Sequence, residues 1–267
     1  MKMNDINGVK FLTFDIFGDI PWLKACFSTR LGGVSLGEKK SMNLIFRDDE
    51  EKNVRENYRR FCEACGFSYD GLTFSAQEHG TNIRRITFED KGKGFFSERD
   101  YRDIDGIYTD EKGIALTTFY ADCVPLYFCD VKKHVAGMSH AGWRGTVNKM
   151  AGKTVNFLIS EFGCDIEDIR VGIGPSIGQC CFEVDFPVYE EFVQKLPFAG
   201  EYIVNKGNGK YLIDLKAINR RVLIERGVSD KNIEISDYCT KCETDLFFSH
   251  RRMGLNRGSM AGIVEIM

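Results

Sequence analysis

Apolar side chains recur every three or four residues in four segments, the spacing that places them on one face of a helix. In the first segment Val54, Tyr58 and Phe61 share such a face, and Gly66 can end the helix. Asp214 suits the N-cap of the last segment. The four predicted helices cover residues 54–65, residues from about 146 to 162, a short stretch after Pro187, and residues from 214 to 227.

Eight shorter apolar runs, several of them bounded by Gly, Asp or Asn, have the length and composition of β-strands. Three consecutive runs are joined by short turns, which favour antiparallel or mixed pairing over crossovers through a helix. The pattern predicts a single α+β domain over residues 1–267, with mixed sheets and outer helices. The runs are Phe11–Phe17, Leu72–Ala76, Ile114–Phe119, Pro125–Cys129, His134–Ser139, Ile169–Ile173, Ile233–Ser236 and Met260–Ile266.

Composition is that of a globular protein, with 267 residues, 43% hydrophobic and 28% charged side chains, and a formal net charge of −3. The small acidic net charge argues against nucleic acid as the main partner, because phosphate backbones favour a strongly basic surface. No apolar run is long enough to span a bilayer, and the N-terminus lacks the order of a secretory signal. We therefore expect a soluble cytoplasmic protein, with neither nucleic acid nor a membrane as partner.

Ten cysteines would suggest disulfides in a small secreted protein, but this chain is neither small nor visibly secreted. Most of them are therefore expected to be buried free thiols in a reducing compartment. This expectation includes Cys180 and Cys181, which are adjacent and cannot easily bridge each other.

Two Cys-x-x-Cys pairs stand out among these cysteines. Cys239 and Cys242 suit either redox chemistry or half of a zinc site. Cys62 and Cys65 fall on the buried face of the first predicted helix, which argues against a four-cysteine zinc site made from the two pairs.

One thiol and two of the four histidines lie where a predicted strand gives way to a loop, the usual place for groups that face a shared pocket. They are His79, Cys123 and His140. Two imidazoles and one thiolate suit zinc and leave a fourth position for water or substrate, as in catalytic zinc sites. Their spacing alone leaves open that they are two ordinary histidines and a core thiol. His134 and His250 lack the same setting.

Two glycine-rich passages offer chemistry for an anion or a base. In HAGWRGT, residues 140–146, Trp143 presents a flat surface and Arg144 can clamp a phosphate or carboxylate. Taken alone, the passage is better explained as a tight strand-to-helix turn with Trp143 packed into the core and Arg144 solvated. In STRLGGVS, residues 28–35, Arg30 and backbone N–H groups could hold an anion, or the segment is only a hairpin turn.

The chain resembles the YfiH-like family, also called the multicopper polyphenol oxidase or laccase-domain family. The resemblance is carried by FSTRLGGVS, QEHG, ADCVPLYFCD, HAGWRGT, GPSIGQCCFEV and CTKCETDLFFSHRRMG, in this order over most of the chain. It implies metal ligands at His79, Cys123 and His140. It also implies mixed β-sheets sandwiched between helices, a fold grouped with cytotoxic-necrotizing-factor-type cysteine hydrolases. Departures from the family pattern are Glu78, usually apolar, and the absence of a histidine after Asn43.

The resemblance implies phosphorolysis of purine nucleosides. Adenosine, inosine, guanosine or methylthioadenosine and phosphate would give the free base and a (methylthio)ribose 1-phosphate, with adenosine deamination at the same site. Zinc is the expected metal, with copper as an alternative. The expected catalytic residues are Cys123, His140, Arg144 and Asp122, and the expected substrate-binding residues are Arg30, Asn43 and Trp143.

The sequence allows more than one residue for proton transfer and for phosphate binding, and more than one class of function. Asp122 and Glu78 are the candidates for a carboxylate that moves protons. Arg144 is the first choice for phosphate, followed by Arg30 and then by Arg251 or Arg252. A complete multicopper laccase lacks the histidines it needs, although copper in the zinc site could oxidise phenols weakly. A cysteine hydrolase with Cys123 as nucleophile and His140 as base, a role in editing cell-wall precursors, and a metal-dependent binding module are the other readings.

Overall fold

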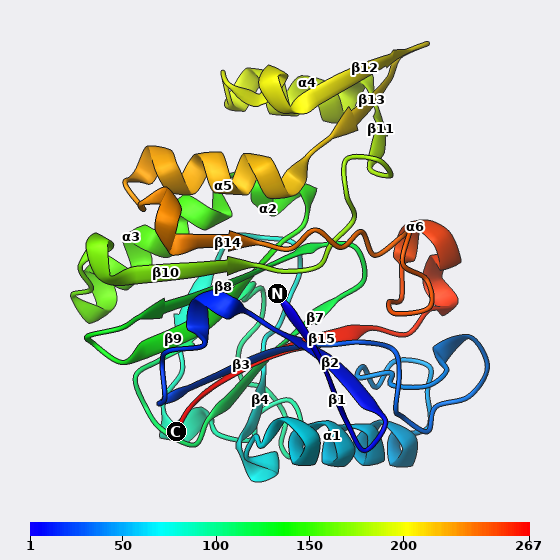
Figure 1. Ribbon diagram of the computed structural model, residues 1–267, viewed down its shortest axis with the longest axis vertical. Coiled ribbons are helices and arrows are strands. Elements are labelled where there is room, and N and C mark those ends of the chain that lie inside the picture. Colours follow the sequence, from blue (N-terminus) through cyan, green and yellow to red (C-terminus); the bar gives the residue numbers. More distant parts are fainter.

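Two six-stranded sheets stack face to face in the computed structural model, which describes residues 1–267 (Figure 1). Three strand pairs are parallel and the others are antiparallel, so the expected mixed sheets are confirmed. The first sheet has the order β1 (Lys2–Ile6), β2 (Val9–Thr13), β3 (Leu23–Ser28), β15 (Met260–Ile266), β7 (Ala115–Tyr120), β4 (Leu72–Phe74). The second has the order β14 (Ile233–Ile235), β10 (Ile169–Ile173), β8 (Val124–Asp130), β9 (Val135–Ala141), β6 (Gly106–Thr109), β5 (Ile83–Arg85).

The inner faces of the two sheets form one apolar core. Leu116 and Val264 of the first sheet belong to the same buried cluster as Tyr127 and Met138 of the second. The Tyr127 hydroxyl also donates a hydrogen bond to the carbonyl oxygen of Cys26, 2.7 Å away, and so links the sheets. Strands β8, β9 and β15 are buried along their whole length, which explains why their sequences read as continuous apolar runs.

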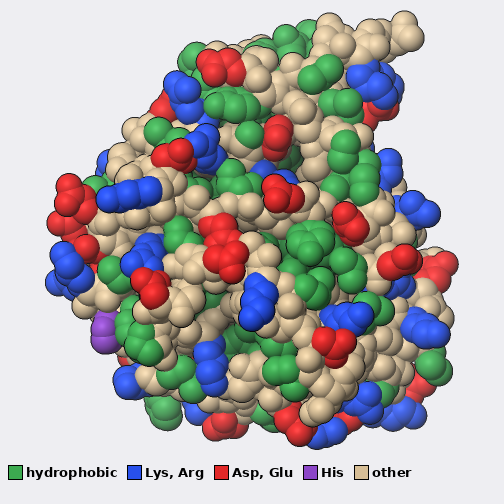
Figure 2. Space-filling model, in the orientation of Figure 1, with side chains coloured by type: hydrophobic (Ala, Val, Ile, Leu, Met, Phe, Trp, Pro, Cys, Tyr) green, Lys and Arg blue, Asp and Glu red, His purple; other side chains and the backbone are tan.

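Helices cover the two outer faces. Helix α1 (Glu51–Cys65) buries Val54 and Phe61 against the first sheet, and α3 (Met150–Phe162) with α5 (Leu215–Arg226) covers the second. The layers are therefore helix, sheet, sheet and helix (Figure 1), the sandwich that the motifs implied. None of the helices combines the length and the apolar composition that a membrane-spanning helix requires. Figure 2 shows acidic and basic side chains interspersed over the face that it draws.

Local capping signals gave three of the four helices correctly. Helix α1 ends at Gly66, whose φ of 74° is the left-handed conformation of a C-cap. The Asp214 carboxylate accepts a hydrogen bond of 3.0 Å from the N–H of Ala217, and Gly227 ends α5 with a φ of 106°. The short helix expected after Pro187 is α4 (Phe186–Lys195).

The second predicted helix is wrong as a single element. It is two helices, α2 (Trp143–Val147) and α3, and it begins before the predicted start. The break lies at Lys149, whose φ of 59° is left-handed and interrupts the ladder of helical hydrogen bonds. The short helix α6 (His250–Met253) has too few residues to produce a periodic pattern and was not predicted.

Each of the eight apolar runs contains a strand, but in the run 11–17 the strand stops at Thr13 and residues 15–17 form a 3₁₀ turn. Exposed polar strands escaped prediction, including β1 and a third sheet of order β11 (Glu183–Asp185), β13 (Lys210–Ile213), β12 (Ile203–Gly207). Strands β8 and β9 pair antiparallel, as expected. Strand β7, however, does not pair with β8, because residues 121–123 carry the chain from the first sheet to the second.

All ten cysteines are free. Five are buried, as expected, but Cys180 is exposed and Cys181 is half-buried, so the expectation of buried thiols is wrong for this pair. The reason is their position in the loop between β10 and β11, which is buried at residues 174–178 but reaches the surface at residues 179–181.

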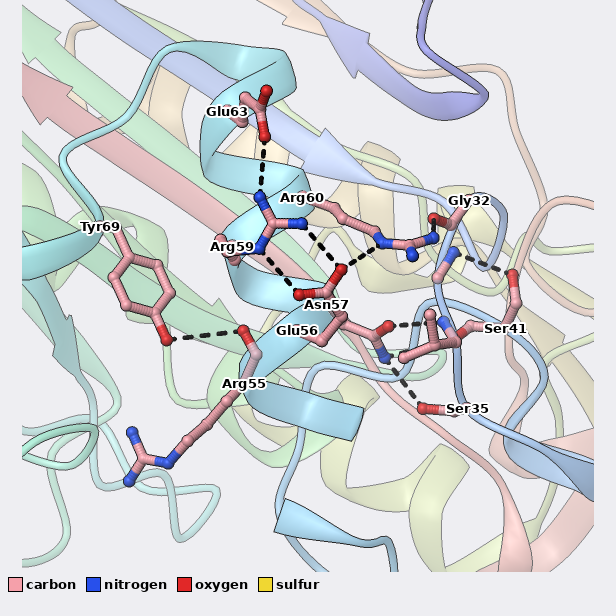
Figure 3. A network of polar contacts seen from close by, with 12 residues as sticks. Gly32, Ser35, Ser41, Arg55, Glu56, Asn57, Arg59, Arg60, Glu63 and Tyr69 are labelled. Atoms are coloured by element: carbon pink, nitrogen blue, oxygen red, sulfur yellow. Dashed lines mark hydrogen bonds and ion pairs between the residues drawn. The ribbon is translucent and has the colours of Figure 1, made fainter. Parts of the chain in front are cut away.

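A buried amide holds the long loop that follows β3 (Figure 3). Asn57, on the inner face of α1, is fully buried. Its Nδ2 donates to Ser35 Oγ at 2.9 Å and to the carbonyl oxygens of Ser41 at 3.2 Å and Asn43 at 2.8 Å. Its Oδ1 accepts from the N–H of Val34 at 2.8 Å. One side chain therefore fixes several turns of a loop that has little regular structure of its own.

Replacing Asn57 by Ala leaves buried donors and acceptors unpaired, so we expect the free energy of unfolding to fall by about 2–4 kcal/mol. Urea denaturation followed by circular dichroism measures the change. Asn53→Ala, one turn earlier in the same helix, is the matched control, because Asn53 is only half-buried and its side chain makes no hydrogen bond. Equal midpoints for the two variants would show that the amide does not hold the loop.

Candidate metal and substrate site

The structure brings together the three residues that the sequence analysis selected because they follow predicted strands. The ligand atoms of His79, Cys123 and His140 all lie within 4.8 Å of one another. His79 comes from the loop between β4 and β5, Cys123 from the crossover between the sheets, and His140 from the end of β9. The two imidazole rings meet edge to face, with centroids 4.9 Å apart. We refer to these three residues as the His-Cys-His trio.

The backbone is unusual at two positions beside or within the trio. His79 has a φ of 65° and Asp122, directly before Cys123, has a φ of 90°. Both values are uncommon for residues with a side chain and occur where the surrounding structure imposes them. Gly142 leaves the room that the trio needs, because a Cβ there would lie 3.0 Å from Cys123 Sγ and 3.2 Å from His79 Cδ2.

The fully buried carboxylate of Asp105 organises the trio from behind. Its Oδ1 accepts hydrogen bonds from His140 Nδ1 at 2.7 Å and from the His79 N–H at 3.1 Å. Its Oδ2 accepts from the N–H groups of Glu78 at 3.0 Å and Gly80 at 2.9 Å. Because Nδ1 of His140 is engaged, Nε2 is the ring nitrogen available as a ligand.

The groups of the trio shift one another's protonation. Burial by itself would raise the pKa of Cys123, but the charge and hydrogen bond of His140, with those of His79, lower it to about 6. Burial by itself would lower the pKa of His140, but Cys123 and Asp105 raise it to about 9. Both shifts favour a thiolate beside an imidazolium, and the thiolate is the form that binds metals.

The donor set fits a single tetrahedral metal ion. One thiolate sulfur and two imidazole nitrogens are ligands that zinc accepts, and three protein ligands leave one position open. Copper also binds such a set. Of the other histidines, His250 lines the adjoining cavity, whereas His134 stacks on Trp22 elsewhere, with ring centroids 4.5 Å apart.

A cavity of about 1070 Å³ opens in front of the trio. It is basic, since six arginines but only two acidic residues line it, and it also has aromatic walls. The arginines are Arg47, Arg99, Arg102, Arg144, Arg251 and Arg257, and the acids are Glu78 and Asp122. The aromatic residues are Phe46, Phe74, Tyr101, Phe119, Tyr120, Trp143 and Phe182. This lining suits a ligand with both an anionic group and a flat ring.

Two residues of the HAGWRGT passage line this cavity at the start of α2. The Arg144 guanidinium lies over the Trp143 ring, 4.4 Å from its centroid, and makes no ion pair within the chain. Arg251 also lines the cavity, although its Nη1 donates to the carbonyl oxygen of Glu183 at 2.7 Å. Arg252 does not line it. Arg144 is therefore exposed to the cavity with its donors free.

Arg30 and Asn43 lie outside the cavity lining. Arg30 donates to the carbonyl oxygens of Lys40 and Thr244, each at 3.0 Å. Asn43 is fully buried, and its Oδ1 accepts from the N–H of Ser259 at 3.0 Å. The structure thus uses both side chains to join loops, and it does not bring them to the trio.

The two candidate carboxylates differ in their surroundings. Both oxygens of Asp122 are engaged, by Thr240 Oγ1 at 2.6 Å, Ser249 Oγ at 3.0 Å and the Arg251 N–H at 2.6 Å. Asp122 therefore ties the C-terminal segment to the turn that carries Cys123. The Glu78 side chain is exposed, lines the cavity, and makes no hydrogen bond or ion pair.

Sequence reasoning missed Asp105 and four of the arginines of the cavity. An acidic residue directly before a buried strand, as in DGIYT, is a signal that could have pointed to Asp105. Nothing in the sequence distinguishes Arg257 from other arginines. In the structure its Nη1 donates to Ser259 Oγ at 2.8 Å, whereas its Nε is buried without a hydrogen-bond partner. Burial lowers the pKa of this guanidinium.

Known proteins resemble this chain over nearly its whole length. A family model described as multi-copper polyphenol oxidoreductase laccase matches residues 24–267. The chain is 37% identical to the purine nucleoside phosphorylase YlmD of Geobacillus stearothermophilus, over 90% of this chain and 89% of that one. It is 35% identical to YlmD of Bacillus subtilis, over 90% and 87% of the two chains.

A solved structure confirms the fold that the motifs implied. The crystal structure of the hypothetical protein YfiH from Bacillus licheniformis superposes with a TM-score of 0.91 at 31% identity. The match covers 99% of each chain. The chain therefore has the YfiH-like α+β fold.

Adding one methyl group at Gly142 tests whether the trio is packed to receive a metal. We expect Gly142→Ala to weaken zinc binding on the order of tenfold, because the new Cβ would crowd Cys123 Sγ and the His79 ring. Titration against a coloured zinc chelator measures the affinity. Gly145→Ala is the matched control, since a Cβ there meets nothing closer than 3.4 Å. Equal affinities in the two variants would contradict a metal site at the trio.

Proposed function

The chain belongs to the family described as multi-copper polyphenol oxidoreductase laccase, and we propose that it is a zinc-dependent purine nucleoside phosphorylase. Relatives at 35% and 37% identity that are named purine nucleoside phosphorylases support this class of reaction. The observation that carries the proposal is the His-Cys-His trio at a cavity lined by arginines and aromatic rings. The proposed substrates are phosphate and adenosine, inosine, guanosine or methylthioadenosine, with adenosine deamination at the same site.

Phosphorolysis breaks the bond between the ribose C1′ and the purine N9 and forms a bond from C1′ to a phosphate oxygen. The chain's contribution is to hold phosphate and nucleoside in contact and to supply a proton to the departing purine. The aromatic walls offer stacking surfaces for the purine, and Arg144 offers free donors to the phosphate. Positive charge around the attacking phosphate also lowers the cost of bringing an anion into the cavity.

The trio would hold the zinc ion, which would supply Lewis acidity at the floor of the cavity. Asp105 keeps the imidazole of His140 oriented for this role through the 2.7 Å hydrogen bond to Nδ1. Glu78 is the better candidate for moving a proton, since it faces the cavity with no partner. Asp122 would position Cys123 and would not transfer a proton, because its three hydrogen bonds hold the chain around Cys123.

A multicopper laccase is disfavoured by the placement of the histidines. Its oxygen-reducing copper cluster needs many imidazoles beyond those of the mononuclear site. Beyond the trio, the cavity has only His250, since His134 is stacked on Trp22. The family's description as a multi-copper laccase therefore does not give the mechanism that we propose for this chain.

A cysteine hydrolase is the second candidate, because one observation favours it. Cys123, His140 and Asp105 are arranged as a nucleophile, a base and an orienting acid, with a thiol whose pKa is lowered to about 6. Such an enzyme would work without metal, whereas the proposed phosphorylase would not. Removal of metal therefore separates the two candidates.

Replacing His79 by Ala removes one of three metal ligands but leaves Cys123, His140 and Asp105 in place. We expect zinc content at the trio and phosphate-dependent release of adenine from adenosine to be lost together, with activity falling at least about a hundredfold. Metal analysis and chromatographic measurement of free base on the same sample check both.

His134→Ala is the matched control for this experiment, because that imidazole lies outside the cavity. It should leave both zinc and activity unchanged. Base release that persists in His79→Ala and after chelation, without a need for phosphate, would favour the cysteine hydrolase. If zinc-loaded protein releases no free base from adenosine, the proposed function is wrong.

Replacing Arg144 by Ala should raise the KM for phosphate about tenfold or more, with zinc content unchanged, because a charge-assisted contact to phosphate is lost. Initial rates at varied phosphate and saturating nucleoside measure the effect. Arg252→Ala is the control, since Arg252 is exposed nearby but does not line the cavity. An unchanged phosphate KM in Arg144→Ala would assign the phosphate to another arginine.

A further inference from the structure

Four cysteines from two distant segments meet at the surface beside the cavity. Cys180 and Cys181 lie in the loop between β10 and β11, and Cys239 and Cys242 lie in the loop between β14 and α6. All four Sγ atoms lie within 4.8 Å of one another. We refer to these residues as the four-cysteine cluster. The other Cys-x-x-Cys pair of the chain, on α1, does not take part.

The known separations of the sulfur atoms fit a tetrahedral thiolate site. The Sγ of Cys242 lies 3.7 Å from that of Cys180 and 3.4 Å from that of Cys181. Zinc–sulfur bonds of about 2.3 Å place neighbouring sulfurs of a tetrahedron about 3.8 Å apart. The cluster therefore needs only small side-chain adjustments to enclose a metal ion.

The backbone around the cluster is shaped for sulfur ligands. The Gly178 N–H donates a hydrogen bond of 3.2 Å to Cys239 Sγ, a contact that favours a thiolate. A Cβ at Gly178 would lie 3.3 Å from Cys180 Sγ and 3.5 Å from Cys239 Sγ. Within the Cys-x-x-Cys turn, the Cys242 N–H donates to the carbonyl oxygen of Cys239 at 3.1 Å. The backbone of the first segment thus approaches a sulfur of the second segment closely, and the Cys-x-x-Cys turn is closed by its own hydrogen bond.

A disulfide explains less of this arrangement than a metal does. One disulfide needs two cysteines at the right separation, but here four sulfurs converge at mutual contact and none is bonded to another. Cys180 and Cys181 are neighbours in sequence and so are poorly placed to bridge each other. A tetrahedral ion uses all four groups at once.

We propose that the four-cysteine cluster binds a structural zinc ion, separate from the His-Cys-His trio. Four thiolate ligands leave no open position, which is the arrangement of structural zinc rather than catalytic zinc. The ion would join two segments that are about sixty residues apart in the chain, and such a link removes conformational freedom from the unfolded chain.

The first of the two segments that the zinc ion would join forms part of the cavity wall, and the second contacts the turn that carries Cys123. Phe182, directly after Cys181, lines the cavity. Thr240, directly after Cys239, donates the hydrogen bond of 2.6 Å to Asp122, beside the trio. A parallel bridge between Ser176 and Cys239, with the Thr240 N–H donating to Ser176 O at 3.0 Å, already aligns the segments. The zinc ion would therefore keep this wall in register with the trio.

The test is metal analysis of the full-length protein and its variants after dialysis against a moderate zinc chelator. We expect Cys242→Ser to hold about one zinc ion per chain fewer than the unmodified protein. Cobalt substitution gives a second readout, because four thiolate ligands produce strong near-ultraviolet charge-transfer bands, which should be much weaker in the variant than in the unmodified protein, leaving only the contribution of the single thiolate of the trio. If Cys242→Ser does not fold, Cys180→Ser decides, since Cys180 is exposed and its loss should make the zinc removable.

Cys65→Ser is the matched control, because it alters the Cys-x-x-Cys pair of α1 and should retain the full zinc content. His79→Ala should also retain the zinc of the four-cysteine cluster, so this test stands whether or not the protein is a phosphorylase. Zinc content that is equal in Cys242→Ser, Cys180→Ser and the unmodified protein would overturn the proposal. Iron in place of zinc, or a disulfide among these cysteines in freshly purified protein, would also overturn it.

Discussion

The buried carboxylate of Asp105 is the contact on which the geometry of the trio depends. A carboxylate with no exposed surface is costly unless its oxygens are satisfied, and this one accepts four hydrogen bonds. Three of them come from consecutive backbone N–H groups around His79, which hold that residue in its left-handed conformation. The fourth comes from His140 and sets the direction of its ring. One side chain therefore positions two of the three proposed ligands.

The third ligand is positioned by the topology of the sandwich. Strands β7 and β8 are consecutive in the chain but lie in opposite sheets, so the chain must turn sharply between them. Cys123 stands at this crossover, and Asp122 stabilises the turn by binding Thr240 and Ser249 of the C-terminal segment. The same segment carries half of the four-cysteine cluster. The trio, the crossover and the cysteine cluster are thus linked through the hydrogen bonds between Asp122 and the C-terminal segment.

The distribution of charge reconciles an acidic net charge with the proposed anionic substrate. The net charge is −3, and acidic and basic side chains alternate over the face drawn in Figure 2. Around the cavity, however, arginines outnumber acidic residues six to two. Net charge governs interactions with large polyanions, whereas a small anion responds to the groups within a few ångströms.

The sequence alone determined the helix ends and most of the buried strands. The ends of α1 and α5 follow from Gly66, Asp214 and Gly227, because capping involves only residues within one turn. Most of the buried strands appear as apolar runs, although β3 and β6 were not predicted, and the trio could be selected because its members follow such runs. Only the tertiary structure decided that β7 leaves β8 for another sheet, that Asp105 lies behind the trio, that Arg30 points away from the cavity and that the four cysteines meet. Each of these depends on contacts between segments far apart in the chain, and no local hydrogen bond or periodicity records them.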